Sequence, residues 1–162
     1  MSSTDAPIFI IGTERSGSNL LRLILDAHPE IRIPHPPHLM NYFGHLDYGD
    51  LSVETNMKRL LKEMIHFIGI HIFPWDSVRL DVDALFDALS VHSHYGAVEA
   101  IYRTDLAHSK KRRWGCKSTF MIHYAQQVLE VYPAAQFILL VRDPRDVAAS
   151  ARKSVFSPCH PY

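Results

Sequence analysis

Residues 12–19 (Gly-Thr-Glu-Arg-Ser-Gly-Ser-Asn) form a segment whose composition suits the binding of a phosphate or sulfate group. The segment lies between a short apolar run at residues 7–11 and a helical pattern at residues 19–27. Backbone N–H groups of the loop and of the first helical turn can therefore point toward one anion, where the helix dipole also favours negative charge. Gly17 lets an anion approach the backbone closely, and the guanidinium of Arg15 can bind two of its oxygens at once.

The spacing of the loop glycines is close to that of a Walker A nucleotide-binding loop. Gly12 allows the tight turn that such a loop needs, and Ser18 and Asn19 can donate side-chain hydrogen bonds. The lysine of the Walker pattern is absent, because Gly17 stands at its position. The alternative interpretation is a tight turn that carries an exposed arginine.

A second polar group follows the apolar run at residues 136–141. Arg142 comes directly after that run, and Ser150 follows eight residues later on a predicted helix. Two anion sites at strand ends of one parallel sheet are typical of nucleotide-binding folds. The alternative is that the arginines of this segment only form ion pairs with Asp143 and Asp146, and helical periodicity alone does not bring Ser150 back to the loop.

The elements that must position these residues alternate between strands and helices. Residues 7–11 and 136–141 are predicted strands buried on both faces, and residues 113–116 a shorter strand. Helices are predicted over residues 19–27, 52–68, 81–89, 95–107 and 120–132, and after a helix entry at Asp143 and Pro144. Residues 31–49 are predicted to be irregular, because proline and glycine interrupt them. This alternation predicts an α/β fold with a right-handed parallel sheet.

Two of these helices carry apolar residues expected to face the core. The first places leucine, isoleucine and alanine at helical spacing, at Leu20, Leu21, Ile24, Leu25 and Ala27. The last is expected to turn four small or branched side chains inward, those of Val147, Ala148, Ala151 and Val155.

Composition places the 162 residues among ordinary globular chains, with 47% hydrophobic and 21% charged residues, and we expect one domain over residues 1–162. Seventeen basic residues balance seventeen acidic ones, which argues against nucleic acid or an anionic membrane as a partner. Two cysteines are too few for a disulfide framework or a zinc site. No apolar run approaches the length of about 20 residues that crosses a bilayer. We therefore expect a soluble, cytoplasmic protein without a metal.

Both polar motifs resemble those of sulfotransferases that use 3′-phosphoadenosine 5′-phosphosulfate (PAPS). Residues 7–21 resemble the 5′-phosphosulfate loop of that family, and residues 137–150 resemble its 3′-phosphate motif, including the arginine-to-serine spacing of eight. Residues 15–32 are most similar to the tyrosylprotein sulfotransferase branch and its bacterial relatives. The resemblance implies a P-loop-containing nucleotide-hydrolase-like fold of three layers, with a central parallel sheet flanked by helices. It also implies PAPS as co-substrate and transfer of a sulfuryl group to a hydroxyl or amine without a metal.

The same resemblance implies roles for individual residues. The 5′ end of the donor is expected to be held by the loop, through Gly12, Thr13, Glu14, Arg15, Ser16, Gly17, Ser18 and Asn19. Arg15 is also expected to offset charge on the leaving oxygen, while Arg142 and Ser150 bind the 3′-phosphate. Lys117 resembles the family lysine that assists at the transferred group; alternatively it is a solvated cation beside the basic residues 110–113.

The proton acceptor is less clearly marked. The tyrosylprotein branch uses a glutamate in the loop that follows the His-Pro step, and Pro36 stands at that position here. His35 and His38 are the nearest candidates, since an unperturbed histidine has a pKa of about 6.5. Glu14 and Glu30 are further alternatives.

Family members are generally longer, and only twelve residues follow Ser150, so the chain is expected to be truncated at its C-terminus. A small molecule, carbohydrate, lipid or peptide could be the acceptor, and the oligomeric state is open. Two other functions compete with sulfotransfer. A P-loop nucleotide kinase or phosphotransferase should show a loop lysine and an acidic magnesium ligand, and a truncated non-catalytic module should bind the nucleotide without turnover.

Overall fold

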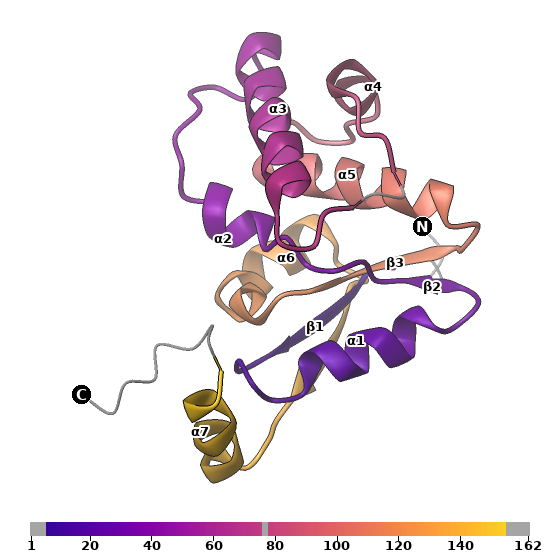
Figure 1. Ribbon diagram of the computed structural model, residues 1–162. Helices are drawn as coiled ribbons and strands as arrows, with labels where there is room; N and C mark the ends of the chain where they lie inside the picture. The colour runs from indigo at the N-terminus through magenta and orange to yellow at the C-terminus, as the bar shows by residue number, and fades with distance from the viewer. Residues whose placement is uncertain (1–5, 76–77, 155–162) are drawn as a thin grey trace.

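A parallel sheet forms the centre of the molecule. The computed structural model describes residues 6–75 and 78–154, and in this part of the chain four strands pair in the spatial order β2-β3-β1-β4 (Figure 1). All three pairings are parallel. The strands are β1 (Ile8–Gly12), β2 (Ile31–Arg32), β3 (Arg113–Lys117) and β4 (Gln136–Leu140).

Helices make up most of the rest of the described chain. They are α1 (Ser18–Asp26), α2 (Leu39–Phe43), α3 (Glu54–Ile70), α4 (Val82–Asp87), α5 (His94–His108), the 3₁₀ helix η2 (Thr119–Tyr124), α6 (Ala125–Val131) and α7 (Pro144–Arg152). Within residues 6–75 and 78–154, none of them combines the length and apolar character that a membrane crossing requires.

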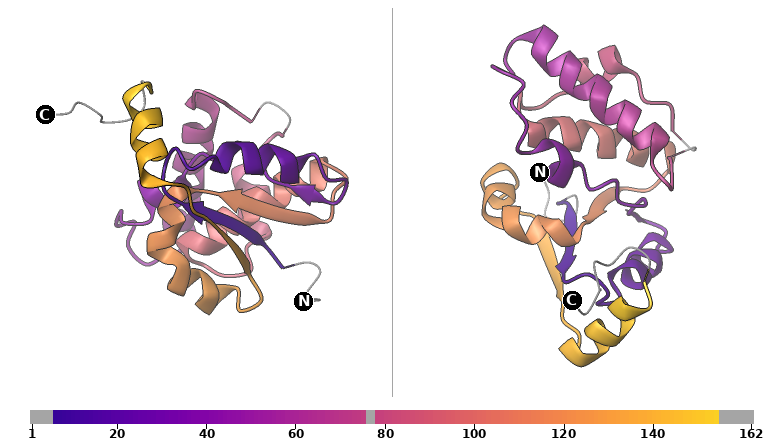
Figure 2. Two further views of the ribbon diagram at one scale, coloured as in Figure 1. Left: turned by 90° about the horizontal axis from the view of Figure 1, so that it is seen from below. Right: turned by 60° about the vertical axis from the view of Figure 1, so that its left-hand side comes forward.

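Helices cover both faces of the sheet, which confirms the predicted α/β class with a central parallel sheet. In Figure 1, α1 lies on one side of the strands, and α5 and α6 lie on the other. The side chains of β1 alternate between these faces: Phe9 and Ile11 belong to the main apolar cluster, whereas Ile8 and Ile10 are buried outside it. Figure 2 shows α7 beside the start of α1, at the carboxyl end of the strands.

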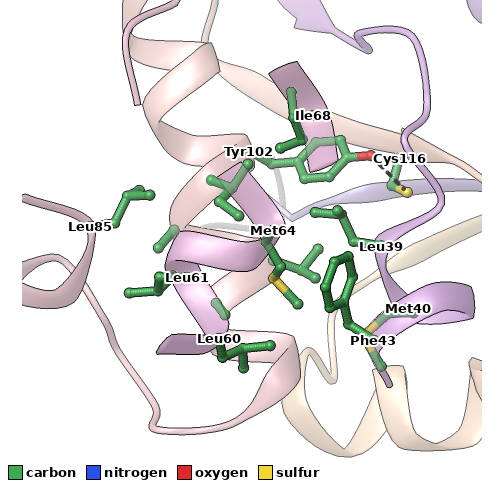
Figure 3. Close-up of a cluster of buried hydrophobic side chains, with 14 of the residues drawn as sticks. Leu39, Met40, Phe43, Leu60, Leu61, Met64, Ile68, Leu85, Tyr102 and Cys116 are labelled. Atoms are coloured by element: carbon green, nitrogen blue, oxygen red, sulfur yellow. Dashed lines mark hydrogen bonds between the residues drawn. The ribbon is translucent and has the colours of Figure 1, made fainter. Parts of the chain in front are cut away.

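The main apolar cluster joins the sheet to the helices α2, α3 and α5. The predicted apolar stripe of α3 is confirmed, because its buried residues recur every three or four positions, at Met57, Leu60, Leu61, Met64 and Ile68. Leu39, Met40 and Phe43 of α2 lie against this stripe (Figure 3). In the same cluster the hydroxyl of Tyr102 lies 3.3 Å from the Sγ of Cys116, which joins α5 to β3.

Two surfaces predicted to be buried are exposed. β4 is the edge strand of the sheet, so Leu139 is 58% exposed instead of being covered on both faces. On α1, Leu20 and Ile24 are also exposed, whereas Arg22 is buried. The reason lies in Arg22, which donates a hydrogen bond from Nη1 to the carbonyl oxygen of Ile33 (3.0 Å) and so turns this polar side chain inward.

The prediction of an irregular segment over residues 31–49 is wrong, because it contains both β2 and α2. β2 has only two residues, too few for any periodicity to appear in the sequence. Its place beside β3 is fixed from outside the segment: the N–H groups of Arg112 and Arg113 both donate to the carbonyl oxygen of Glu30. The carboxylate of Asp26 in α1 also accepts from the N–H of Ile33 (2.7 Å).

The last two predicted helices also differ from the structure. Residues 120–132 are not one helix, because Tyr124 departs from helical dihedrals (φ −115°, ψ 9°) between η2 and α6. In α7 only Ala151 is buried, while Ala148 is exposed, because α7 follows an edge strand and packs on little else. Val155 lies outside the described residues.

The register of the strands gathers the polar motifs at one edge of the sheet. Gly12 pairs with Leu140, and Ile10 pairs with Lys117. The residues that follow β1, β3 and β4 therefore leave the sheet at the same edge, where parallel folds bind their ligands.

Candidate anion-binding site at the carboxyl edge of the sheet

A cavity of about 420 Å³ opens at this edge. It is lined by Glu14, Arg15, Gly17, Ser18, Asn19, His38, Lys117, Thr119, Arg142, Ser150 and Ser154. Three of these residues carry a positive charge and one, Glu14, a negative charge, so the lining has a formal charge of +2 in a chain whose net charge is zero. The cavity therefore favours an anion.

The loop backbone is shaped to receive that anion. Arg15 and Gly17 both have positive φ angles (62° and 96°), and alternation of this kind turns successive N–H groups toward one side. The N-terminus of α1 has no side-chain cap, so its first N–H groups are left for a ligand. No heavy atom lies within 4 Å of the position of a Cβ on Gly17, and the buried Oγ of Ser16 has no partner among the described residues. The loop therefore fits an oxyanion.

The two distant polar motifs meet at this loop. Arg15 donates from Nε to the Oγ of Ser150 (3.1 Å), and Arg142 donates from Nη1 to the carbonyl oxygen of Arg15 (3.1 Å). Arg142 also lies 3.8 Å from a carboxylate oxygen of Asp146, too far for a hydrogen bond. Arg145, by contrast, pairs with the carboxylate of Asp143, the residue before α7, and its side chain is 89% exposed. Both arginines thus form the ion pairs of the alternative interpretation, and Arg142 in addition lines the cavity.

Lys117 stands at the end of β3 and lines the same cavity. Burial lowers the pKa of its ammonium group, and the positive charge of Arg22 lowers it further, while the carboxylate of Glu14 acts in the opposite direction. The alternative of a freely solvated cation does not describe this half-buried position. A lysine held here can contact an anion in the cavity directly.

The two candidate histidines occupy different surroundings. His38 lines the cavity, and its Nδ1 lies 2.9 Å from the Oγ of Ser118. His35 does not line the cavity, because its ring packs against Phe73 and His71 at centroid distances of 4.3 and 5.8 Å. Burial is the main cause that lowers the pKa of both histidines to about 4.

The two glutamates are also separated. Glu14 lines the cavity, whereas Glu30 pairs with Arg112 near β2 (3.3 Å). The remaining predicted loop residues are close to the cavity without lining it: Gly12, Thr13 and Ser16. Gly12 has a packing role, because a Cβ there would lie 2.5 Å from the carbonyl oxygen of Leu140.

Four residues of the site were missed in the sequence. Thr119 and Ser154 line the cavity, and Ser118 contacts His38. Arg22 donates from Nε to the side chain of Asn19 (2.9 Å) and so orients a cavity residue from within α1. Its spacing of three from Asn19 is the one local signal that could have indicated this contact.

The fold and the cavity together define an α/β protein with a central parallel sheet and a positively charged cavity at the carboxyl ends of its strands. The sulfotransferase family matches residues 7–162, and the chain belongs to that family. It is 29% identical over 149 residues to the nodulation protein NoeE of Sinorhizobium fredii (strain NBRC 101917 / NGR234). This similarity covers 90% of the present chain and 31% of NoeE, so the chain spans about a third of the length of that relative.

Proposed function

We propose that the chain carries the donor-binding and transfer site of a PAPS-dependent sulfotransferase that acts on a hydroxyl or amine acceptor. The observation that supports this most directly is the meeting of Arg15, Arg142 and Ser150 at one cavity. Along the sequence, Arg15 lies 127 residues from Arg142 and 135 residues from Ser150. PAPS carries anionic groups at both its 5′ and 3′ ends. A site with one cationic group from each of two strand ends matches that charge distribution.

Each group in the cavity then has a part in binding. The loop amides with Ser18 and Asn19 bind the 5′ phosphosulfate, and Arg142 with Ser150 binds the 3′-phosphate. Arg15 and Lys117 stabilise charge on the bridging oxygen and on the transferred group, which is where fixed cations contribute most to group transfer.

The transfer step breaks the bond between sulfur and the bridging phosphate oxygen and forms a bond from sulfur to the acceptor oxygen or nitrogen. Adenosine 3′,5′-bisphosphate leaves with the electron pair of the broken bond. The acceptor proton passes to one of two bases that line the cavity, the Glu14 carboxylate or the His38 imidazole. We propose that the acceptor enters at the end of the cavity lined by His38 and Thr119.

Calorimetric titration with adenosine 3′,5′-bisphosphate tests the donor site. Arg15→Ala and Arg142→Ala each remove a charged hydrogen-bond donor, worth about 1.5–3 kcal/mol, and should weaken binding by about 10- to 150-fold. Arg145→Ala is the matched control, because it removes an arginine of the same segment that points away from the cavity; its affinity should stay within about twofold. Equal losses in all three variants would argue against a specific site.

Two further measurements separate the competing functions. A nucleotide kinase should bind ATP more tightly than the bisphosphate and need magnesium to do so, and that result would overturn the sulfotransferase proposal. Release of adenosine 3′,5′-bisphosphate from PAPS in the presence of a panel of alcohols and amines distinguishes a transferase from a binding module. Tight binding of adenosine 3′,5′-bisphosphate without any release of it from PAPS would indicate a non-catalytic binding module.

A further inference from the structure

A buried serine contacts the histidine of the cavity. Ser118 follows Lys117 at the end of β3, is 2% exposed and donates its backbone N–H to the carbonyl oxygen of Ile10 (3.3 Å). Its Oγ lies 2.9 Å from Nδ1 of His38. His38 is itself fixed, since it begins α2 in a left-handed conformation (φ 53°) and its ring meets the edge of Phe120 at 5.3 Å. The contact therefore joins two well-held groups.

Counting hydrogens assigns a direction to this contact. A serine hydroxyl has one hydrogen, and within the described residues the Ser118 Oγ has one hydrogen-bond partner, Nδ1 of His38. A buried hydroxyl hydrogen without an acceptor is costly. The Oγ–H of Ser118 should therefore donate to Nδ1, which then holds a lone pair.

The other ring nitrogen is consequently fixed as well. Burial, with a further contribution from the Lys117 ammonium and from His35 and His71, lowers the pKa of His38 to about 4, so the ring is neutral at pH 7. A neutral imidazole carries one proton, and with Nδ1 acting as acceptor that proton must be on Nε2. His38 lines the cavity, and its Nε2 is not a buried atom without a hydrogen-bond partner, so the Nε2 proton is not trapped in the core.

We propose that Ser118 is a positioning residue that holds His38 as the Nε2–H tautomer, so that His38 donates a hydrogen bond to the anionic group in the cavity instead of accepting the acceptor proton. Glu14, the acidic side chain of the cavity lining, then takes that proton. This inference rests on the proposed sulfotransfer function for its consequence, but the tautomer is a property of the unliganded protein.

If His38 were the base through Nε2, the ring would have to donate from Nδ1 to the Ser118 Oγ. The hydroxyl hydrogen of the buried Ser118 would then have no acceptor among the described residues. A donor at Nε2 has no such cost, and it adds one more hydrogen bond to a cavity that already collects cations. The position of His38 beside Lys117 suits this role, because both groups then act on the same negative charge.

Nitrogen-15 NMR of the histidine-labelled chain tests the tautomer without any turnover. The His38 signals are assigned by their loss in His38→Gln, and we expect the Nε2-protonated form at pH 7. Ser118→Ala should release the preference and raise the fraction of the Nδ1-protonated form, whereas Ser118→Thr keeps the hydroxyl and should keep the tautomer. An Nδ1-protonated ring in the unaltered chain, or a tautomer unchanged by Ser118→Ala, would overturn the inference.

Kinetics with PAPS then test the consequence. The side-chain amide of His38→Gln places an N–H donor near the position of Nε2 but cannot act as a base, so kcat should stay within about tenfold of the unaltered chain. His38→Ala removes the donor and should lose about 100-fold or more. Equal losses in the two variants would overturn the donor role. Glu14→Gln should lose kcat while keeping its affinity for the bisphosphate, and full activity in this variant would overturn its role as proton acceptor.

The two proposals fail separately. If the unaltered chain transfers nothing from PAPS and binds no bisphosphate, the proposed function is refuted. The NMR measurement still decides which tautomer His38 adopts, because it needs neither ligand nor turnover. If transfer occurs but the tautomer is the opposite one, sulfotransfer stands and the inference on Ser118 is refuted.

Discussion

The two glycines of the anion-binding loop should respond differently to alanine, because the space around them differs. At Gly12 the backbone has φ +148°, and a Cβ would lie 2.5 Å from the carbonyl oxygen of Leu140 on the paired strand. At Gly17 φ is +96°, and no heavy atom lies within 4 Å of the Cβ position. Packing and backbone conformation together therefore require glycine at position 12. At position 17 the backbone conformation alone favours glycine, and the proposed ligand adds a second requirement.

These differences set the expected magnitudes. Gly12→Ala combines backbone strain of about 1–3 kcal/mol with a contact penalty of about 1–3 kcal/mol, so the melting temperature should fall by about 5–20 °C. Gly17→Ala carries the backbone cost alone, about 1–2 kcal/mol, which corresponds to about 2–8 °C. Its methyl group stands in the open cavity lining, so affinity for adenosine 3′,5′-bisphosphate should fall by about tenfold or more.

Thermal unfolding followed by circular dichroism, together with titration calorimetry, measures both quantities. Gly69→Ala serves as control: Gly69 lies in α3, its Cβ position is also free of neighbours, and alanine there should stabilise the helix by up to about 1 kcal/mol. The reasoning is refuted if Gly17→Ala binds the bisphosphate like the unaltered chain, or if it destabilises the fold more than Gly12→Ala does.

Three further properties follow from buried groups. Asp105→Ala removes two hydrogen bonds to Arg32 (2.7 and 3.0 Å) and should cost about 3 kcal/mol in urea unfolding; a loss below about 1 kcal/mol would contradict the importance of this pair. Burial raises the pKa of the Cys116 thiol to about 11, so in a variant without the other cysteine a disulfide reagent should label it only as fast as the chain unfolds, and rapid labelling of the folded protein would speak against its burial. Burial lowers the pKa of His35 and His38 from 6.5 to about 4, so the unfolded chain binds more protons between these values. Stability should therefore be fully present above pH 6.5 and decrease as the pH falls toward about 4, with a smaller decrease in His38→Gln; a melting temperature that does not change over this range would exclude the effect.

Much of the fold could be read from local patterns. The apolar run of β1, the stripe of α3 and the entry of α7 at Asp143 and Pro144 each depend on neighbours within a few residues, and the structure has them close to the predicted places. β2 and the exposed face of β4 could not be read in the same way. Their state depends on which strand stands beside them, and the strand order is set by contacts far apart in the sequence.

In the candidate site, too, local motifs could be predicted from the sequence, whereas contacts between distant residues could not. The glycine loop and the arginine-to-serine spacing were visible as motifs, and both reach the cavity. The choice between His38 and His35 was not visible, because the two histidines lie three residues apart in one proline-rich loop and differ only in what the folded chain puts around them. Ser118 showed no signal at all, since its partner is 80 residues away.

The sequence by itself thus determined the class of fold, the glycine-rich loop and the two polar motifs, because glycine, proline, charge and apolar periodicity act over short distances along the chain. Only the tertiary structure decided that Arg15, Arg142 and Ser150 meet, that Lys117 is half-buried beside them, and that one histidine faces the cavity. Those outcomes depend on the parallel register of β1, β3 and β4, which brings the ends of separate strands to one edge and which no local pattern specifies.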